Sequence, residues 1–443
     1  MARKVLISVL GTGIYGSCQY EDLSTGFLSS ETRFIQQATM EYLDAKNWTN
    51  NDMAYFLLTD SARTDNWNES ITERIKSNKE KIPYKGLQSI LKEMNLPFSP
   101  VDISIPDGKD EKEMWQIFTR LFDVLQEGDE LYFDLTHSFR YLPMLVLVLG
   151  NYAKFLKNAT VKHISYGNYE ARNKETNKAP MVNLLPLSAL QDWTFAAGQF
   201  LDSGNVKKLT SLSNMTLKPI LKEAKGTNID ANNLKKFISD LSAVIDERTL
   251  CRGISIVKSD SLRMLKEDSS KIEKSFIEAL NPVFNKIKES IDDFDENENV
   301  QNGFKAAKWC LQNGLYQQAI TIFHENIVTL LCKEENLIWT NEDERSIVSI
   351  AFKVDRNNVN LWNLNLKSNA TDKEKNEKID KIKRVFNNRH FNLLCDIYSK
   401  INNIRNDFNH SGMRNNPMCA NKLKSVIEEC MQQVETLLHL NPC

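Results

Sequence analysis

The feature that most constrains this chain is the alternation of β-rich runs with amphipathic helical patterns in its first part. The β-rich runs are Lys4–Leu10, Ala54–Thr59, Val101–Ile105, Glu130–Leu135 and Val161–Tyr166. The helical patterns between them are Glu31–Ala45, Pro83–Asn95, Glu111–Leu125 and Leu142–Leu156. Repeated β-α units of this length favour a mainly parallel sheet that is covered by helices on both faces. The alternation therefore predicts one Rossmann-like α/β domain over residues 1–190.

The pattern changes after residue 190, where strand signals nearly vanish. Amphipathic stretches recur at Leu190–Ser203, Leu234–Ile245, Ser261–Leu280, Pro282–Phe294, Phe304–Leu311, Tyr316–Lys333, Phe391–Asn403 and Lys422–Leu440. The acidic segment Asp292–Asn302 is the best candidate for a linker. The polar stretch Lys367–Lys383 is interpreted as an exposed insertion. We therefore predict a helical connector over 191–300 and an all-α domain over 301–443.

Composition and charge narrow the classes of partner. With 41% hydrophobic and 26% charged residues and a net charge of −2, the chain has an ordinary globular composition, so any nucleic acid must be bound by a local surface. The longest apolar run, Leu142–Gly150, is too short to span a bilayer, and no membrane partner is expected. The eight cysteines occur singly, without a C-x-x-C motif, which favours reduced thiols in a cytoplasmic protein without a zinc site.

The segment Gly11-Thr12-Gly13-Ile14-Tyr15-Gly16 matches the dinucleotide fingerprint G-x-G-x-x-G. That fingerprint needs a helix that starts at once and a carboxylate about 20 residues later for the ribose. Here helical periodicity begins only near Glu31, and the carboxylate after the second predicted strand, Asp60, lies more than twice that distance away. The context therefore disfavours a nicotinamide-dependent enzyme, which stays open as an alternative. A simple glycine turn is the competing interpretation.

Polar residues follow two of the predicted strands, where ligands of open α/β sheets bind. The candidate ligand-binding residues are Gly11, Thr12 and Gly13 after the first strand, and Thr136, His137, Ser138 and Arg140 after the fourth. Hydroxyl, imidazole and guanidinium groups just before a helix suit an anionic ligand, whose phosphates would meet Arg140 and the helix amides.

A second motif, Arg405-Asn406-Asp407-Phe408-Asn409-His410, lies near the end of the chain. Histidine exchanges protons near neutral pH, and arginine supplies a fixed cation for charge developing on a phosphate, so this R-x4-H spacing can support metal-free RNA cleavage. On one helix Arg405 and His410 point in different directions, which favours a site built from two copies. Gly412 is expected to end that helix.

Two other histidines bear on this interpretation. Arg384 and His390 match a looser form of the motif, and a basic helix face with a surface histidine is the simpler interpretation of either match. Arg405–His410 is preferred because Asn406 follows the arginine and Ser411-Gly412 follow the histidine. His324 lies inside the apolar helical pattern Tyr316–Lys333 and is expected to be structural.

In their order along the chain, VLISVLGTG, DLTHSFRYLPM and RNDFNHSG resemble the CARF–HEPN ancillary ribonucleases of type III CRISPR systems. The resemblance covers essentially the whole chain, and DLTHSFRYLP is its most specific part. It implies a CARF domain that binds a cyclic oligoadenylate, with the tetra-adenylate as the expected ring, at the twofold axis of a homodimer or higher oligomer. It also implies a HEPN domain that cleaves single-stranded RNA without a metal or other cofactor.

By position, Gly11, Thr12 and Gly13 match the first CARF loop, and the fourth-strand motif supplies Thr136, His137, Ser138 and Arg140. Arg405 and His410 match the catalytic pair, with Asn406 in the usual polar position. The implied reaction is attack of a ribose 2′-hydroxyl on the adjacent phosphate, which leaves a cyclic phosphate and a 5′-hydroxyl. A non-catalytic regulator that senses a cyclic nucleotide and binds a partner through its helical half remains a second alternative.

Overall fold

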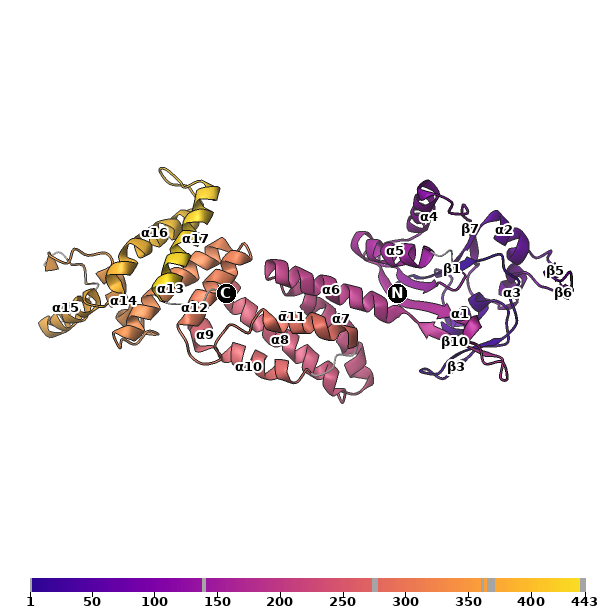
Figure 1. Ribbon diagram of the computed structural model, residues 1–443, viewed down its shortest axis with the longest axis horizontal. Helices are drawn as coiled ribbons and strands as arrows, with labels where there is room; N and C mark the ends of the chain where they lie inside the picture. The colour runs from indigo at the N-terminus through magenta and orange to yellow at the C-terminus, as the bar shows by residue number, and fades with distance from the viewer. Residues whose placement is uncertain (1, 138–140, 273–277, 360–361, 365–370, 439–443) are drawn as a thin grey trace. The chain divides into compact units, whose positions relative to one another are not determined.

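The structure is a computed structural model that describes residues 2–137, 141–272, 278–359, 362–364 and 371–438 (Figure 1). It contains two compact units, Met1–Gln191 and Asp192–Cys443, and the boundary between them falls within helix α6, Leu185–Ser203. The first unit is mixed α/β, and the described part of the second is helical, which confirms the predicted order of fold classes. The further division of the second unit at residues 300 and 301 stays a prediction.

The first unit is built on an eight-stranded sheet in the order β3-β2-β10-β9-β8-β1-β4-β7. Its strands are β1 Lys4–Leu10, β2 Gln19–Asp22, β3 Phe27–Leu28, β4 Met53–Leu58, β7 Val101–Ser104, β8 Glu130–Asp134, β9 Thr160–Gly167 and β10 Lys178–Asn183. The strands β7, β4, β1, β8 and β9 run parallel, as predicted, whereas β10 is antiparallel to β9 and β2 to β3. A separate hairpin pairs β5, Glu73–Ile75, with β6, Lys81–Pro83.

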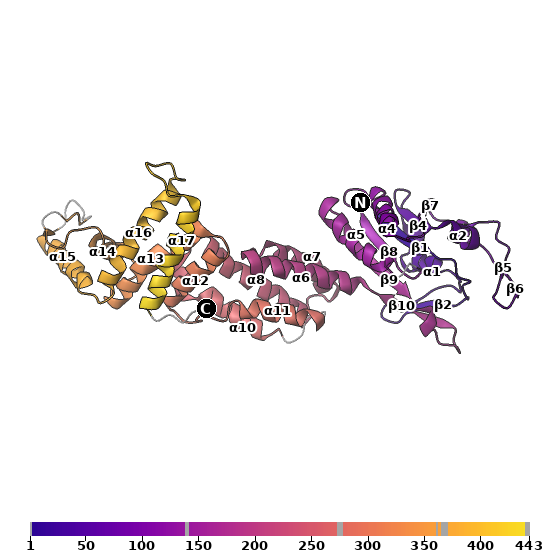
Figure 2. The ribbon, with the colours of Figure 1, turned by 45° about the horizontal axis from the view of Figure 1, so that its top comes forward.

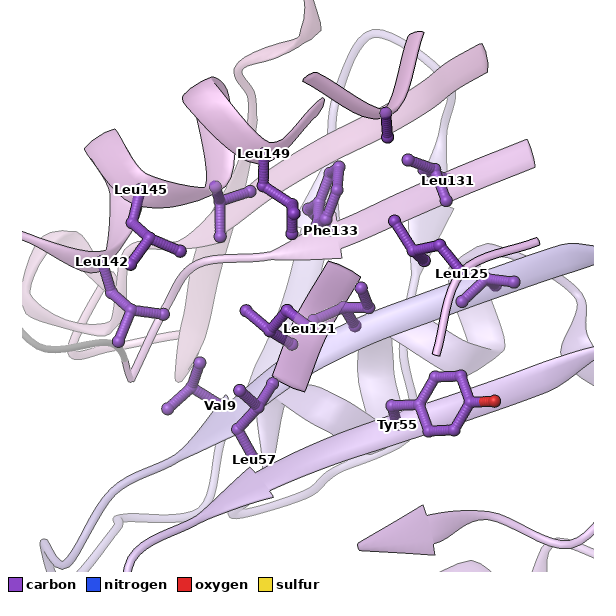
Figure 3. Packing of buried hydrophobic residues seen from close by; sticks show 14 of the residues in the cluster. Val9, Tyr55, Leu57, Leu121, Leu125, Leu131, Phe133, Leu142, Leu145 and Leu149 are labelled. Atoms are coloured by element: carbon purple, nitrogen blue, oxygen red, sulfur yellow. The ribbon is translucent and has the colours of Figure 1, made fainter. Parts of the chain in front are cut away.

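Strand β1 lies in the middle of this sheet and is buried on both faces. Val5, Ile7 and Val9 belong to a core beneath the helices α4, Glu111–Asp123, and α5, Leu142–Leu156. Leu6 and Leu10 belong to the opposite core, which is covered by α1, Ile35–Tyr42, and α3, Leu87–Glu93. A central parallel strand is a continuous apolar run because helices cover both of its faces. Figure 3 shows residues of the first core.

The second unit consists of helices in its described part. They are α7 Lys207–Glu223, α8 Ile229–Thr249, α9 Gly253–Lys258, α10 Asp260–Ser270, α11 Asn281–Glu289, α12 Gln301–Gln312, α13 Tyr316–Glu334, α14 Glu342–Ala351, α15 Asp372–Phe386, α16 Phe391–Asn409 and α17 Ala420–Leu437. Helix α13 is buried along most of its length and packs against α12, α14 and α16 (Figures 1 and 2). An apolar helix of this kind forms the centre of a helical domain, because neighbours can cover it on every side.

The two polar segments singled out in the sequence both lie in the second unit. Most of the expected insertion Lys367–Lys383 belongs to α15, whose capping box joins Thr371 and Glu374 and whose buried face includes Ile382. The helix was missed because its buried positions are few and lie near its C-terminal end. The role of Asp292–Asn302 as a linker stays a prediction. Its last residue, Asn302, donates hydrogen bonds to Ser259 and to the carbonyl oxygen of Asp295. None of the described helices is both long and apolar enough to cross a membrane.

Candidate functional site

The loops after β1 and β8 lie side by side because the two strands are parallel neighbours. Their register pairs Lys4 with Glu130 and Ser8 with Asp134, so both strands end at the same edge of the sheet. A Cβ added at Gly11 would lie 3.6 Å from the Cβ of His137 and 2.7 Å from the hydroxyl oxygen of Tyr15. The glycine at this position thus gives both aromatic side chains room, and the structure brings two predicted ligand-binding segments together.

A buried carboxylate holds the second of these loops. Asp134 accepts hydrogen bonds from Ser8 Oγ at 2.6 Å and from Thr136 Oγ1 at 2.6 Å, and Thr136 Oγ1 in turn accepts from the amide of Gly167 at 2.8 Å. Burial raises the pKa of Asp134, and the bonds from Ser8 and Thr136 oppose that change. The hydroxyl of Thr136 therefore joins the ends of β8 and β9, and Asp134 continues this link to Ser8 of β1.

His137 stacks on the ring of Tyr15, with 4.0 Å between the ring centroids and 19° between the planes. Burial lowers the pKa of His137 to about 4, so the imidazole is neutral near pH 7. Within the described residues its Nε2 has no hydrogen-bond partner. The other predicted residues of this loop, Ser138 and Arg140, lie outside the described residues.

The glycine loop is held by two residues that the sequence did not single out. Asn66 Nδ2 donates to the carbonyl oxygens of Gly11 and Gly13, both at 2.8 Å, and Arg74 Nη2 donates to that of Thr12 at 3.1 Å. Asn66 comes from a π-helical turn over Arg63–Trp67, a rare element that often occurs at functional sites. No spacing signal links these distant residues to the loop, because only the packing of the π-helical turn and of the separate hairpin brings them there.

The second predicted site lies at the end of α16. Arg405 and Asn406 are in its last turns, and His410 is the C-cap residue with an exposed side chain. The chain then turns through left-handed conformations at Ser411 and Gly412, with φ of 53° and 71°, and the amide of Gly412 donates to the carbonyl of Asp407 at 2.9 Å. This is the glycine-dependent helix end that the sequence predicted.

Arg405 is bound by the neighbouring helix α13. Its Nη1 lies 2.7 Å from Nδ1 of His324 and 3.2 Å from Oε1 of Glu325. The same Nδ1 of His324 lies 3.2 Å from Oε1 of Glu325, so the arginine, the imidazole and the carboxylate contact one another. His324 is buried and was expected to be structural, yet its ring nitrogen contacts the candidate catalytic arginine.

Glu325 is held in turn by Arg345 of α14. Arg345 Nη2 donates to Glu325 Oε2 at 2.8 Å and to the Glu325 carbonyl at 3.0 Å, while its Nη1 donates to Thr329 Oγ1 at 2.8 Å. The contact with His324 and the hydrogen bond from Arg345 lower the pKa of Glu325 to about 2. The carboxylate is therefore ionised near neutral pH, and we call Arg405, His324, Glu325 and Arg345 the arginine cluster.

The positions of Arg405 and His410 agree with the helical geometry. Arg405 points toward α13, whereas His410 is exposed, and no hydrogen bond joins their side chains among the described residues. The looser motif is arranged differently: His390 Nδ1 lies 2.7 Å from Oε1 of Glu334, at the end of α13. His390 thus packs between helices.

In the part of the chain that the structure describes, no group of three or more His, Cys, Asp or Glu side chains could hold a metal ion.

Residues 5–173 match the family described as "CRISPR system endoribonuclease Csx1, CARF domain". The chain is also similar to "CRISPR-associated protein MJ1674" of Methanocaldococcus jannaschii, with 27% identity over 238 residues. That alignment covers 52% of this chain and 34% of the relative, so this chain matches about a third of the relative's length.

Proposed function

Because residues 5–173 form a CARF domain of the kind found in CRISPR ancillary proteins, we propose that the chain is a ribonuclease activated by a cyclic oligoadenylate. In this proposal the CARF domain senses the ring in type III CRISPR defence. The helical unit then cleaves single-stranded RNA without a metal. The observation that carries the proposal is the presence, in one chain, of a CARF domain and an R-x4-H motif whose arginine is held in place by a second helix.

The ligand site is proposed at the edge where β1 and β8 end. Asn66 and Arg74 engage the carbonyl oxygens of Gly11, Thr12 and Gly13, which favours contact between ligand phosphates and backbone amides of this loop. The neutral His137 stacks on Tyr15, and its buried Nε2, without a partner among the described residues, is the atom that an adenine or a ribose hydroxyl would bind. The proposal also includes Ser138 and Arg140 as ligand-binding residues, on the basis of the sequence alone.

The reaction is proposed at Arg405 and His410, with Asn406 beside them. Among the described residues, both partners of Arg405 meet its Nη1, so the N–H groups on Nη2 and Nε are left to stabilise charge on the scissile phosphate. His410 would act as the general acid or base, and its exposed place at the helix end gives RNA access to it. The 2′-hydroxyl would attack the phosphorus, and the 5′-oxygen would leave with a proton.

A direct test is cleavage of labelled RNA in EDTA, with and without cyclic tri-, tetra- and hexa-adenylate. We expect one ring to activate the wild type, and Arg405→Ala and His410→Ala to lower kcat by about 100-fold or more. Full activity of the double variant would contradict the catalytic assignment. Activity that is indifferent to every ring would contradict the sensing role. Ring binding without RNA turnover would instead support the regulator.

A further inference from the structure

A cavity of about 210 Å³ lies beside the arginine cluster in the second unit. It is lined by Cys251, Gly253, Ile254, Gly303, Thr321, Ile322, Glu325, Asn326, Thr329, Trp339 and Arg345. Two of these residues, Glu325 and Arg345, are also members of the cluster, so the cavity wall and the candidate catalytic arginine share the Glu325 carboxylate. A ligand in the cavity would therefore lie within a side chain's length of Arg405.

The size and the lining of the cavity fit one planar heterocycle. Pockets for drug-sized ligands usually measure about 300–1,000 Å³, so this smaller cavity suits a single ring system. Trp339 supplies an aromatic surface, and nucleobases stack on such side chains in single-stranded RNA complexes. Glu325 and Thr321 supply oxygen atoms that accept hydrogen bonds.

We propose that this cavity receives one base of the RNA substrate, stacked on Trp339 and hydrogen-bonded through an exocyclic amino group to Glu325. Oε1 of Glu325 already contacts Arg405 and His324, whereas Oε2 accepts a hydrogen bond from Arg345 and has a second lone pair for the base. Uracil has no exocyclic amino group, and its one N–H donor on that edge lies between two carbonyl oxygens, whose lone pairs would face the carboxylate. The site therefore favours adenine, guanine and cytosine over uracil at one position next to the cleaved bond.

This inference rests on the proposed ribonuclease function, and it concerns which RNA is cleaved rather than whether RNA is cleaved. The test uses deoxythymidine strands with a single ribonucleotide, so that only one bond can be cleaved. The base is varied among A, C, G and U, first on the ribonucleotide and then on the nucleotide that follows it. The activated full-length protein is compared with Trp339→Ala, Trp339→Phe and, as a matched control, Ile338→Ala, whose side chain is exposed.

We expect the wild type to favour the amino-bearing bases at one of the two positions. Trp339→Ala should raise KM for them by about 5- to 150-fold and reduce the preference, since stacking on an aromatic ring is lost. Trp339→Phe should retain most of both, and Ile338→Ala should behave as the wild type. A Trp339→Ala protein with the wild-type KM and base preference would overturn the proposal.

A binding measurement separates this inference from the proposed function. Full-length His410→Ala protein is mixed with a strand that carries 2-aminopurine at the preferred position. Stacking on Trp339 should quench its fluorescence, and Trp339→Ala in the same background should not. Quenching without RNA cleavage by the wild type would keep the subsite and reject the ribonuclease. Cleavage by the wild type without Trp339-dependent quenching would reject the subsite alone.

Discussion

The guanidinium of Arg405 is oriented before any RNA binds, because His324 and Glu325 of another helix hold its Nη1. Arg345 fixes Glu325 from a third helix, so the arginine is positioned by a chain of hydrogen bonds. Tyr398 packs on His324 with 4.6 Å between ring centroids and limits the movement of the imidazole. Such positioning matters to catalysis, because displacement of a reacting group by about 1 Å can cost about 100-fold in rate.

We therefore predict that Glu325→Gln lowers kcat for RNA cleavage by about 10- to 100-fold with a smaller change in KM. Glutamine keeps the size of the side chain, but its NH2 group replaces one of the two carboxylate oxygens. That group can only donate, and it would face an arginine, which also only donates. The matched control is Glu334→Gln on the same helix, since Glu334 contacts His390 and not Arg405. Equal activity of the two variants would show that Glu325 does not position the arginine.

Two buried histidines in the first unit predict a pH dependence of stability. Burial lowers the pKa of both His137 and His163 to about 4, from an ordinary value of 6.5. Between pH 6.5 and 4 the unfolded chain therefore binds protons that the folded chain does not. The stabilising contribution is complete above pH 6.5 and is lost as the pH falls toward 4, by about 3 kcal/mol for each histidine.

His137→Phe should keep the stack on Tyr15 and remove about half of this histidine-dependent loss, because one of the two buried imidazoles is gone. The measurement is the free energy of unfolding by denaturant at about pH 7.5 and about pH 5, on the wild type and the variant. The difference between the two pH values cancels any change in packing that does not depend on pH. Identical pH dependence in both proteins would mean that His137 is not buried as a neutral imidazole.

At the scale of elements, the end of α16 determines where His410 lies. Gly412 has a φ of 71° and Ser411 a φ of 53°, so two successive residues are left-handed directly after the C-cap. A Cβ at Gly412 would meet nothing closer than 3.8 Å, at Pro417. A substitution there would act through backbone strain alone, since L residues with a side chain disfavour this conformation.

Gly412→Ala should therefore destabilise the protein by about 1–2 kcal/mol and lower RNA cleavage, because the strained turn displaces His410. The matched control is Gly128→Ala, at a φ of 76° with no atom within 4 Å of the added Cβ, in the first unit. Both variants should lose similar stability in denaturant, and only Gly412→Ala should lose activity at saturating activator. Equal activity of the two variants would contradict the prediction that the end of α16 positions His410 for catalysis.

At the scale of the whole molecule, we predict that the proposed activity uses two copies of the chain. Arg405 faces α13 while His410 is exposed at the helix end, so one copy does not bring the pair together in the described residues. Mixing inactive Arg405→Ala with inactive His410→Ala protein should restore part of the activity, since a mixed dimer holds one intact arginine and one intact histidine across the interface. Activity per molecule should also fall on dilution. Failure of mixing, with exchange of copies shown independently, would contradict a shared site.

The sequence by itself determined the elements and motifs whose signals are local. The hydrophobic pattern located the five central strands and most helices. Strands such as β1, which are buried on both faces of a parallel sheet, consist of continuous apolar runs. The end of α16 before Gly412 was also predicted, since helix ends depend on neighbouring residues, whereas α1 begins at Ile35, four residues after the predicted Glu31. The short strands β2, β3 and β10 were not, because pairing with a neighbour rather than residue type makes them strands.

Only the tertiary structure decided which side chains support the candidate sites. Asn66 and Arg74 hold the glycine loop from more than 50 residues away, and His324, Glu325 and Arg345 hold Arg405 from two other helices. His324 looked structural because an apolar helical pattern reveals burial but not the neighbour that a buried polar atom meets. Contacts between elements depend on how helices and strands pack, and they cannot be predicted from the spacing of residues in the sequence.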